Sequence, residues 1–388
     1  MNTGPDNDWS GHFMRSFFYN WSGKIALLAA ALVAGGIVPS ARAFAPADAD
    51  TIFSAYTKAF YFTNDNGGFF RATTDGGKTW FWERAEQMEM LLDTYERATN
   101  PACLTMFSNV FKGFIADHGA TWEQNEFNDD IMWMVIACAR AHQLTGNPVY
   151  RDTARTNFDL CYARAWSTNL GGGWWWKTSN LSKNACVNGP ASIAAFLLYQ
   201  ISGDTNYLAK ARAAYDWERE NLFDPGTGEI WDSMDYRGEI NNKVFTYNLG
   251  TFIGAANFLG QTNDARLAAD YAKNELCRDG IMPGYRQEGD AGGFNGICAR
   301  WTARFMKDRG LHASYQAWLQ ANADAAWKVR RPDDNLSWSR WFRPTPEGPL
   351  NSWACSSSVV MMQVVPASED PKRKLFSTFS DGKNSQKK

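Results

Sequence analysis

The sequence predicts an all-α protein, an (α/α)6 barrel of six helical hairpins. Apolar residues recur with helical spacing along most of the chain, and tight joints between helices recur every 50 to 57 residues. No segment alternates convincingly between polar and apolar residues, as a half-buried strand would. About six hairpins suit a closed ring of six inner and six outer helices. An open array of the same hairpins is the alternative.

Twelve helices are expected, with boundaries at Pro, Gly and Asn residues that commonly start or stop helices. They span residues 46–62, 80–97, 101–116, 129–144, 148–166, 190–201, 206–222, 246–259, 264–276, 293–307, 312–329 and 352–364. Because each tight joint closes one hairpin, inner and outer helices should alternate along the chain.

Glycine marks the tight joints. Gly146, Gly203 and Gly260 follow one another at intervals of 57 residues, and Gly310 comes 50 residues later. Glycine readily adopts the left-handed conformation that ends a helix. The Asn, Asp or Thr residues after the first three glycines can cap the next helix. These segments therefore predict short helix–turn–helix connections.

Longer connections rich in Gly, Trp and Asn lie opposite the tight joints and should gather on one face. They span residues 63–80, 117–130, 167–189, 223–246, 279–295 and 331–352. Long loops on a rigid scaffold often carry function. We expect the site here, in a ring of polar residues near the starts of the inner helices: Asp129, Asp130, Asn188, Tyr247, Asn248, Asn295 and Asn351.

The adjacent pair Asp129 and Asp130, at the mouth of the apolar helix 129–144, is the main catalytic candidate. Glycoside cleavage uses one carboxylic acid to protonate the leaving oxygen and one carboxylate as nucleophile or base. Neighbouring carboxylates resist joint ionisation, so one pKa rises, while helix amides favour ionisation of the other. Acidic residues in a first turn are also ordinary helix caps, so this pair alone is a weak motif.

Amino-acid composition limits the classes of ligand and partner that this protein is expected to bind. The 39 basic and 41 acidic residues nearly balance, which gives no electrostatic case for nucleic acid. The 18 Trp, 14 Tyr and 25 Phe residues suit sugar stacking or a large helical core. The seven Cys residues lack metal-ligand spacing, so we predict no metal. Buried free thiols are favoured, and one or two disulfides stay open.

Several motifs follow one another between about residues 50 and 365. They are Asn128-Asp129-Asp130 before Trp133, Gly171-Gly-Gly-Trp174-Trp175-Trp176-Lys177, Lys183-Asn184-Ala185, Asn188-Gly189-Pro190 and Tyr247-Asn248-Leu249-Gly250. In this order and spacing they resemble the signature of glycoside hydrolase family 76, the bacterial endo-α-1,6-mannanases. Met132 departs from that pattern, because a second aromatic residue is expected beside Trp133.

The resemblance implies an (α/α)6 barrel that hydrolyses α-1,6-mannosidic linkages with retention and needs no metal or other cofactor. It implies that Asp129 is the nucleophile and Asp130 the acid/base. The substrate-binding candidates are Asn128, Trp174, Trp175, Trp176, Asn188, Tyr247 and Asn248. The three Trp residues could instead pack in the barrel rim, and Asn188 and Asn248 could serve only as helix caps.

Other acidic residues receive simpler interpretations. Trp82 and Glu83 open the second helix and could line the cleft, although a solvated Glu83 is favoured. Asp232, Asp235 and Glu239 lie in the loop before Tyr247 and are the reserve candidates for catalysis. The triplet 333–335 imitates the catalytic motif, but no apolar inner helix follows it directly, so we predict a loop.

The N-terminal segment predicts an exported protein. Residues 1–43 resemble a signal peptide, with the apolar run 25–38 followed by Ala41-Arg42-Ala43 and a mature start at Phe44. The apolar run is short and broken by glycine, so no stable membrane span is expected. Residues 44–366 form the barrel domain, and residues 367–388 a polar, disordered tail. The protein should be secreted or periplasmic, and a monomer.

The predicted partner is α-mannan or a mannooligosaccharide. A mannan transglycosylase acting on cell-wall or lipid-linked glycans remains an alternative, as does a noncatalytic glycan-binding toroid. An unsaturated-uronide hydrolase or lyase would need basic residues for the substrate carboxylates. The predicted mouth loops are richer in Trp, Asn and Asp, which favours a neutral sugar.

Overall fold

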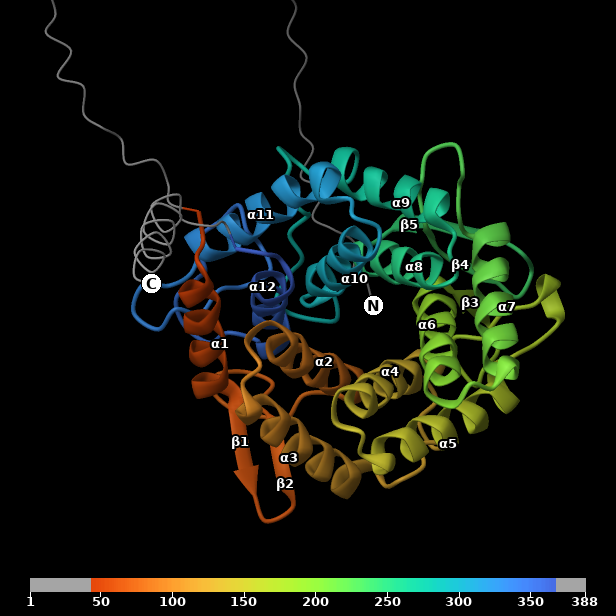
Figure 1. Cartoon of the computed structure of the whole chain (residues 1–388), viewed down its shortest axis with the longest axis horizontal. Helices are drawn as coiled ribbons and strands as arrows, with labels where there is room; N and C mark the ends of the chain where they lie inside the picture. The colour runs from red at the N-terminus through yellow and green to blue at the C-terminus, as the bar shows by residue number, and fades with distance from the viewer. Residues whose placement is uncertain (1–42, 368–388) are drawn as a thin grey trace, which may run out of the picture.

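The computed structural model describes residues 43–367, which form two concentric rings of helices (Figure 1). The inner ring contains α2 (Phe81–Ala98), α4 (Asn128–Thr145), α6 (Ala185–Ser202), α8 (Thr246–Phe258), α10 (Phe294–Asp308) and α12 (Ser352–Val364). The outer ring contains α1 (Pro46–Phe60), α3 (Pro101–His118), α5 (Pro148–Ala165), α7 (Thr205–Asn221), α9 (Thr262–Asn274) and α11 (His312–Lys328).

The inner helices are buried on all sides because they pack against both neighbours and an outer helix. In α4 every residue from Ile131 to Ala141 is buried, which agrees with an apolar sequence that lacks a polar face. The ring closes because α12 contacts both α10 and α2, and α1 packs against α12. This closure confirms the (α/α)6 barrel and excludes the open array.

The predicted tight joints are confirmed. Gly146 and Gly203 adopt the left-handed conformation, with φ angles of 69° and 72°, and end α4 and α6. Asn147 then caps α5 by accepting a hydrogen bond from the amide of Val149. Asp204 caps α7 in the same way. Because these joints are short, all six inner helices run in one direction and all their N-termini lie at one end.

Five short strands, which the sequence analysis missed, order the long connections. β1 (Tyr61–Asn64) and β2 (Gly67–Phe70) form an antiparallel hairpin. β3 (Ser182–Asn184), β4 (Trp231–Asp235) and β5 (Ile240–Val244) form an antiparallel sheet in the order β3-β4-β5. Strands of three to five residues are too short to show a clear alternating pattern. The sheet ties the connection before α6 to the connection before α8.

The start of α6 also differs from the prediction. Pro190 was expected to open this helix, since proline favours the first turn. The helix instead begins at Ala185, after β3, so that Pro190 and Asn188 lie inside it. A proline inside a helix removes one backbone hydrogen bond. A 3-10 turn at Asn169–Gly171 (η1) precedes this region.

All seven Cys residues are free thiols, six of them buried, which confirms the favoured prediction. No helix within residues 43–367 is long and apolar enough to cross a membrane. Residues 1–42 of the predicted signal peptide, and residues 368–388 of the predicted tail, lie outside the described part of the chain.

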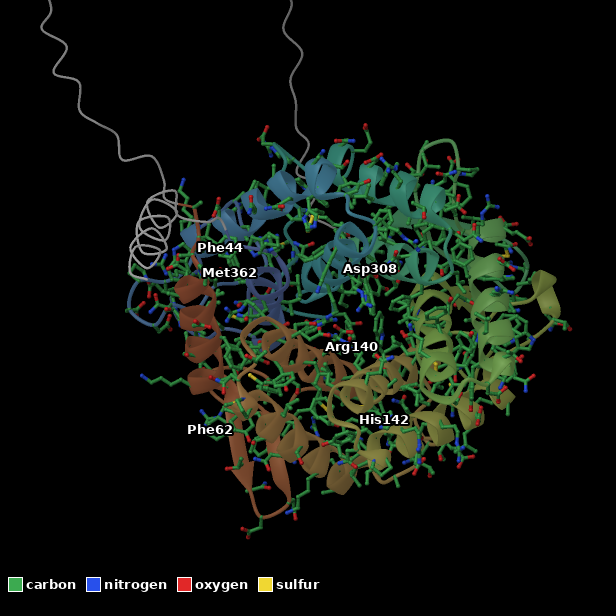
Figure 2. The ribbon with its side chains drawn as sticks, viewed as in Figure 1. Phe44, Phe62, Arg140, His142, Asp308 and Met362 are labelled. Carbon is green, nitrogen blue, oxygen red and sulfur yellow. The ribbon has the colours of Figure 1, made fainter. Side chains whose placement is uncertain are left out.

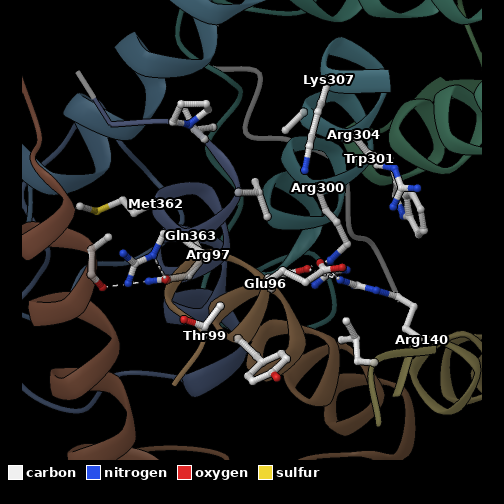
Figure 3. A pocket seen from close by; sticks show the side chains of 18 of the residues that line it. Glu96, Arg97, Thr99, Arg140, Arg300, Trp301, Arg304, Lys307, Met362 and Gln363 are labelled. Carbon is white, nitrogen blue, oxygen red and sulfur yellow. Dashed lines mark hydrogen bonds and ion pairs between the residues drawn. The ribbon is translucent and has the colours of Figure 1, made fainter. Parts of the chain in front are cut away.

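The C-terminal ends of the inner helices surround a cavity of about 920 Å³. Arg300 and Lys307 extend toward it from α10, and Arg140 from α4 (Figure 3). Arg140 lies close to the barrel axis (Figure 2). This cavity is at the opposite end of the barrel from the aspartate pair.

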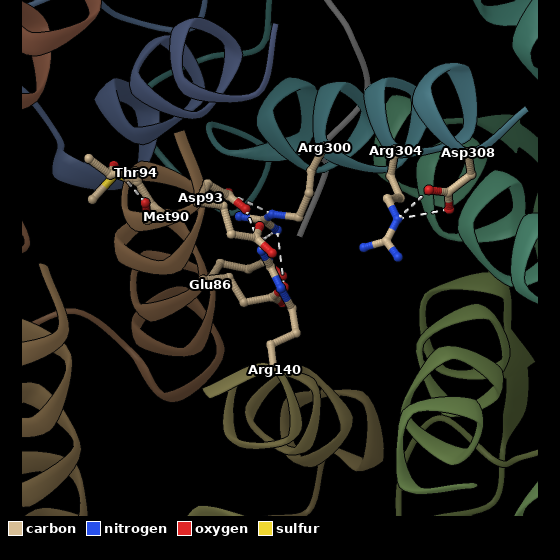
Figure 4. A network of polar contacts seen from close by, with 10 residues as sticks. Glu86, Met90, Asp93, Thr94, Arg140, Arg300, Arg304 and Asp308 are labelled. Carbon is tan, nitrogen blue, oxygen red and sulfur yellow. Dashed lines mark hydrogen bonds and ion pairs between the residues drawn. The ribbon is translucent and has the colours of Figure 1, made fainter. Parts of the chain in front are cut away.

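A buried ion cluster crosses the barrel axis near that cavity (Figure 4). Arg140 binds Glu89 at 2.7 Å and Asp93 at 2.8 Å. Arg300 binds Glu86 at 2.6 Å and the other oxygen of Asp93 at 2.8 Å. Because α2 and α10 are not neighbours in the ring, these contacts brace the barrel across its centre.

Candidate active site

The aspartate pair lies in the first turn of α4, at the end of the barrel that carries the long connections. Asn128 begins the helix, and its amide donates to the carbonyl of Trp176 at 2.9 Å. Phe127, one residue earlier, forms an isolated β-bridge with Lys177. The connection before α6 is thereby fixed against the start of α4, which brings its tryptophans to the aspartates.

The two oxygens of Asp129 have different surroundings. Oδ2 accepts a hydrogen bond from Trp176 Nε1 at 3.0 Å and another from Cys186 Sγ at 3.3 Å. Oδ1 is buried and has no hydrogen-bond partner among the described residues. One oxygen of this carboxylate is therefore held by two side chains, and the other is buried without a hydrogen-bond partner.

Asp130 has fewer partners. Its Oδ2 accepts one hydrogen bond, from Asn125 Nδ2 at 3.0 Å. Among residues 43–367, neither Asp129 nor Asp130 pairs with a Lys, Arg or His side chain. The two carboxyl groups therefore lack the cation that normally stabilises a buried carboxylate.

Burial dominates the ionisation of the pair. It raises the pKa of Asp129 to about 7, although the hydrogen bonds from Cys186 and Trp176 and the nearby first-turn amides favour the ionised form. Burial also raises the pKa of Asp130, and the charge of Asp129 raises it further. Because Asp129 accepts more hydrogen bonds, it loses its proton first, and Asp130 keeps its own.

A continuous aromatic surface accompanies the pair, with rings from five of the six inner helices. Trp82 packs against Trp353 at 4.6 Å and lies 6.1 Å from Trp133, measured between ring centroids. Tyr247 lies 6.5 Å from Trp133 and stacks on Phe294 at 3.8 Å. Trp82 and Tyr247 are partly exposed and can stack on the apolar faces of sugar units, whereas Trp133, Phe294 and Trp353 are buried behind them.

The family model described as "Glycosyl hydrolase family 76" matches residues 45–374. The chain belongs to glycosyl hydrolase family 76. It is therefore a glycoside hydrolase, as the sequence motifs predicted.

Solved structures agree. The α-1,6-mannanase of Salegentibacter sp. HEL1_6 is 31% identical, with a TM-score of 0.75 over 82% of this chain and 98% of that chain. An inactive variant of that enzyme with two aspartates replaced by asparagine, in complex with α-1,6-mannotriose, is 30% identical, with a TM-score of 0.76 and the same coverage. Dfg5 of Chaetomium thermophilum, in complex with glucosamine, shares only the fold, at 16% identity and a TM-score of 0.70 over 87% of this chain and 97% of that chain. No curated protein matches the chain.

In this family 76 hydrolase, the predicted substrate-binding residues divide into two groups. Trp176 and Tyr247 border the aspartates, since Trp176 binds Asp129 and Tyr247 belongs to the aromatic surface. Trp174 is fully buried against Phe158, and Trp175 is 5% exposed. These last two rings pack beneath the site, as in the alternative that placed the tryptophans in the barrel rim.

Asn128 and Asn188 use their side chains to hold the protein's own backbone. Asn128 donates to the carbonyl of Trp175 at 2.8 Å and accepts from Arg164 at 2.7 Å. Asn188 accepts from the amide of Trp174 at 2.8 Å and donates to the carbonyl of Asn184 at 2.9 Å. Both are buried, and their contacts position the tryptophan connection.

The glycine run before the tryptophans has a steric cause. Gly173 has a φ angle of +85°, and a Cβ atom there would lie 2.4 Å from the Trp217 ring. Lys183 fixes the same connection by donating to the carbonyls of Ser167, Asn169 and Gly172. The Gly-rich segment therefore serves a close approach of backbone to an aromatic ring.

Asn248 and Asp232 form a second polar contact near the pair. Asn248 is buried, and its Nδ2 donates to Asp232 Oδ1 at 3.4 Å. Asp232 also accepts from Asn241 at 2.9 Å, whereas Asp235 binds Arg237 in the β4–β5 turn. Asp232 is thus held by amide groups of α8 and β5, and Asp235 belongs to a turn.

Two acidic residues near the site were misjudged or missed. Glu83 was expected to be solvated, but it is 6% exposed and accepts a hydrogen bond from the Trp80 amide. Burial raises its pKa to about 7. Asp290 accepts from Trp82 Nε1 at 3.0 Å. Trp82 was expected as a possible cleft residue, whereas Phe294 and Trp353 were missed. A sequence signal for these two did exist, because each is the first or second residue of an inner helix.

Proposed function

We propose that this glycoside hydrolase cleaves α-1,6-mannosidic linkages with retention of configuration, with Asp129 as nucleophile and Asp130 as acid/base. The observation that carries the assignment is the asymmetry of the pair. Asp129 presents one unpartnered oxygen and ionises first, whereas Asp130 keeps a proton that it can donate. A retaining mechanism needs one group of each kind.

Similarity to the Salegentibacter enzyme supports the choice of residues. The inactive variant of that α-1,6-mannanase is substituted at two consecutive aspartates. This chain has a second adjacent pair, Asp333 and Asp334, but it occupies a turn and Asp334 binds Arg331. Asp129 and Asp130 are the pair at the start of an inner helix, beside the aromatic surface.

The proposed reaction has two steps. Asp129 Oδ1 attacks the anomeric carbon while Asp130 gives its proton to the departing glycosidic oxygen, which leaves a covalent mannosyl–aspartate ester. Asp130, now ionised, then removes a proton from water. The water oxygen attacks the same carbon and releases Asp129, so that two inversions retain the configuration.

The surroundings of the pair favour a neutral sugar. Trp82 and Tyr247 provide partly exposed rings. Asp232, Asp290 and Glu83 provide carboxylates that can accept hydrogen bonds from hydroxyl groups. An anionic sugar would be repelled by this set of acids. The proposed substrates are therefore linear α-mannan and mannooligosaccharides.

The experiment is hydrolysis of linear α-1,6-mannan, with the anomeric configuration of the first product followed by NMR. We expect the α-anomer to form first and the β-anomer to follow by mutarotation. If the β-anomer forms first, the enzyme inverts the configuration, and Asp129 would act as a general base for water and not as a nucleophile. If an added mannooligosaccharide is extended faster than the chain is hydrolysed, the protein is a transglycosylase. A folded protein that binds the mannan without turnover would be the glycan-binding toroid.

We also propose that the protein is exported to the periplasm or medium and acts as a monomer. The proposal rests on the signal-like sequence of residues 1–43. N-terminal sequencing of the exported protein should begin at Phe44, and light scattering should give the mass of one chain. An exported protein that starts at Met1 would overturn the cleavage site.

A further inference from the structure

We infer that Cys186 is a positioning residue for Asp129: its thiol and the Trp176 indole hold Oδ2, which leaves Oδ1 to attack the sugar. This inference rests on the proposed function, because it assigns the reacting atom within the proposed nucleophile. Cys186 takes no part in the bond changes, and its proton stays on sulfur throughout.

The thiol is placed by elements that converge from three parts of the chain. Cys186 is the second residue of α6 and lies two residues after the end of β3, which pairs with β4. Its Sγ lies 3.3 Å from Asp129 Oδ2, within hydrogen-bonding distance for sulfur. The residue is 3% exposed, so solvent does not compete for this contact. A weak donor such as a thiol gains strength when it donates to a buried carboxylate.

A second contact fixes the thiol itself. The Tyr247 side chain lies beside the Cys186 thiol, and each group affects the pKa of the other. The Tyr247 ring is held by its stacking on Phe294, at 3.8 Å and an interplanar angle of 13°. The chain from Tyr247 through Cys186 to Asp129 therefore links the first turns of α8, α6 and α4.

The arrangement matters because the two oxygens of a free carboxylate are equivalent. Two donors on Oδ2 fix rotation of the carboxyl group and concentrate negative charge on that oxygen. Oδ1 becomes the ester oxygen when it attacks, and Oδ2 becomes the ester carbonyl. When the ester is cleaved, the same two donors stabilise the carboxylate as it departs.

The test compares three substitutions at position 186 with a control in the same barrel. Cys186→Ala removes the donor and some volume, Cys186→Val removes the donor but fills the space, and Cys186→Ser keeps a donor. Cys138 is the control, because it is buried in α4 and burial alone raises its pKa. The measurements are kcat, KM and the pH profile of kcat/KM on an α-1,6-mannooligosaccharide.

We expect the Ala and Val variants to lose about 10- to 150-fold in kcat with little change in KM, the effect of one hydrogen bond to a charged group. The acidic limb of kcat/KM should move to higher pH, because the ionised form of Asp129 loses a donor. The Ser variant should recover most of the loss. Cys138→Ala should leave kcat and the pH profile unchanged.

Wild-type kcat and pH profile in Cys186→Val would overturn the inference, and so would a Ser variant as slow as Ala. These failures are distinct from failure of the proposed function, for which Asp129→Asn serves as the reference. If Asp129→Asn is inactive and Cys186→Val is not impaired, only the role of Cys186 is wrong. If Asp129→Asn remains active, the proposed nucleophile is wrong and Cys186 has nothing to position.

Discussion

The two ends of the barrel both contain buried carboxylates, and they differ in what surrounds them. At the C-terminal end of the inner helices, Glu89 and Asp93 are bound by Arg140 and Arg300. At the N-terminal end, Asp129 and Asp130 have no cationic partner within the described residues. The guanidinium contacts brace the fold across its centre. The two aspartates that lack a cation have raised pKa values, which suit acid–base chemistry.

Helix polarity explains why the two ends differ. The six inner helices are parallel, so their N-termini converge at one end and their C-termini at the other. Helix N-termini stabilise negative charge and C-termini stabilise positive charge. Asp129, Asp130 and Glu83 lie in first turns, whereas Arg97 and Lys307 lie in last turns. The basic lining of the C-terminal cavity therefore follows from the architecture.

The largest effect should come from the unpaired aspartates. Asp129→Asn and Asp130→Asn should each lower kcat by at least about 10³-fold, because each removes a group that forms or breaks a bond. Neither should lower the free energy of unfolding at neutral pH, since each removes a buried carboxyl group that lacks a cation. Activity assays and urea unfolding measure the two outcomes.

Asp333→Asn is the matched control, because it alters the other adjacent aspartate pair, in an exposed turn. It should retain full activity. If Asp333→Asn is inactive while Asp129→Asn is active, the site is assigned to the wrong pair.

Substitutions in the Arg–carboxylate cluster should lower stability and leave kcat nearly unchanged. Arg300→Met should lower the free energy of unfolding by about 3–5 kcal/mol, because it leaves buried carboxylates without their cation. The folded fraction should keep near-normal kcat, since the ion-pair partners of Arg300 are Glu86, Glu89 and Asp93 and not the aspartate pair. Arg304→Met, one turn later and about half exposed, should cost less than about 1 kcal/mol. Equal losses in both variants would contradict a bracing role for the cluster.

A smaller effect is expected at the hydrogen bond from Trp176 to Asp129. Trp176→Phe keeps a ring but removes the Nε1 donor, so kcat should fall about 10-fold. The pKa of Asp129 should rise, and the acidic limb of kcat/KM should move to higher pH. Trp318→Phe, on the outer helix α11, should change neither quantity. An unshifted acidic limb in Trp176→Phe would show that Asp129 does not control it.

Glu218 tests whether an unpaired carboxylate must be catalytic. It is buried on the outer helix α7, neither oxygen has a partner in the described chain, and burial raises its pKa. In the unfolded chain the Glu218 carboxyl group loses its proton at about pH 4, whereas in the folded chain it keeps the proton to higher pH. The group therefore destabilises the fold progressively as pH rises above the unfolded pKa.

Glu218→Gln should accordingly raise the free energy of unfolding at pH 8, change it little at pH 4, and leave kcat unaltered. Glu220→Gln, an exposed neighbour on α7, should show no such pH dependence. A Gln variant that is no more stable than wild type at pH 8 would mean that Glu218 is not held in its neutral form.

Part of the site could be predicted from the sequence because it depends only on neighbouring residues in the chain. Asp129 and Asp130 occupy a first turn, and a cap before an apolar run marks that position without reference to the rest of the fold. The roles of Asn128 and Asn188 were not visible. Each bonds to the backbone of the 174–176 segment, and a capping Asn has the same sequence pattern as one that binds sugar.

The aromatic surface could not be predicted from local sequence patterns. Trp82 and Asp290 form a hydrogen bond although they are 208 residues apart in the chain. Trp133, Tyr247 and Phe294 meet only because three inner helices lie side by side. No window of sequence contains such a neighbourhood.

The sequence by itself determined the helical hairpins, their tight joints and the end of the barrel that carries the aspartates. Those features follow from interactions within a few turns of chain, such as periodic burial, left-handed glycines and side-chain caps. Only the tertiary structure decided that the ring closes, that the far-end acids have Arg partners, and that Oδ1 of Asp129 is free. These properties depend on side chains from separate helices and on burial, which exists only once the chain has folded.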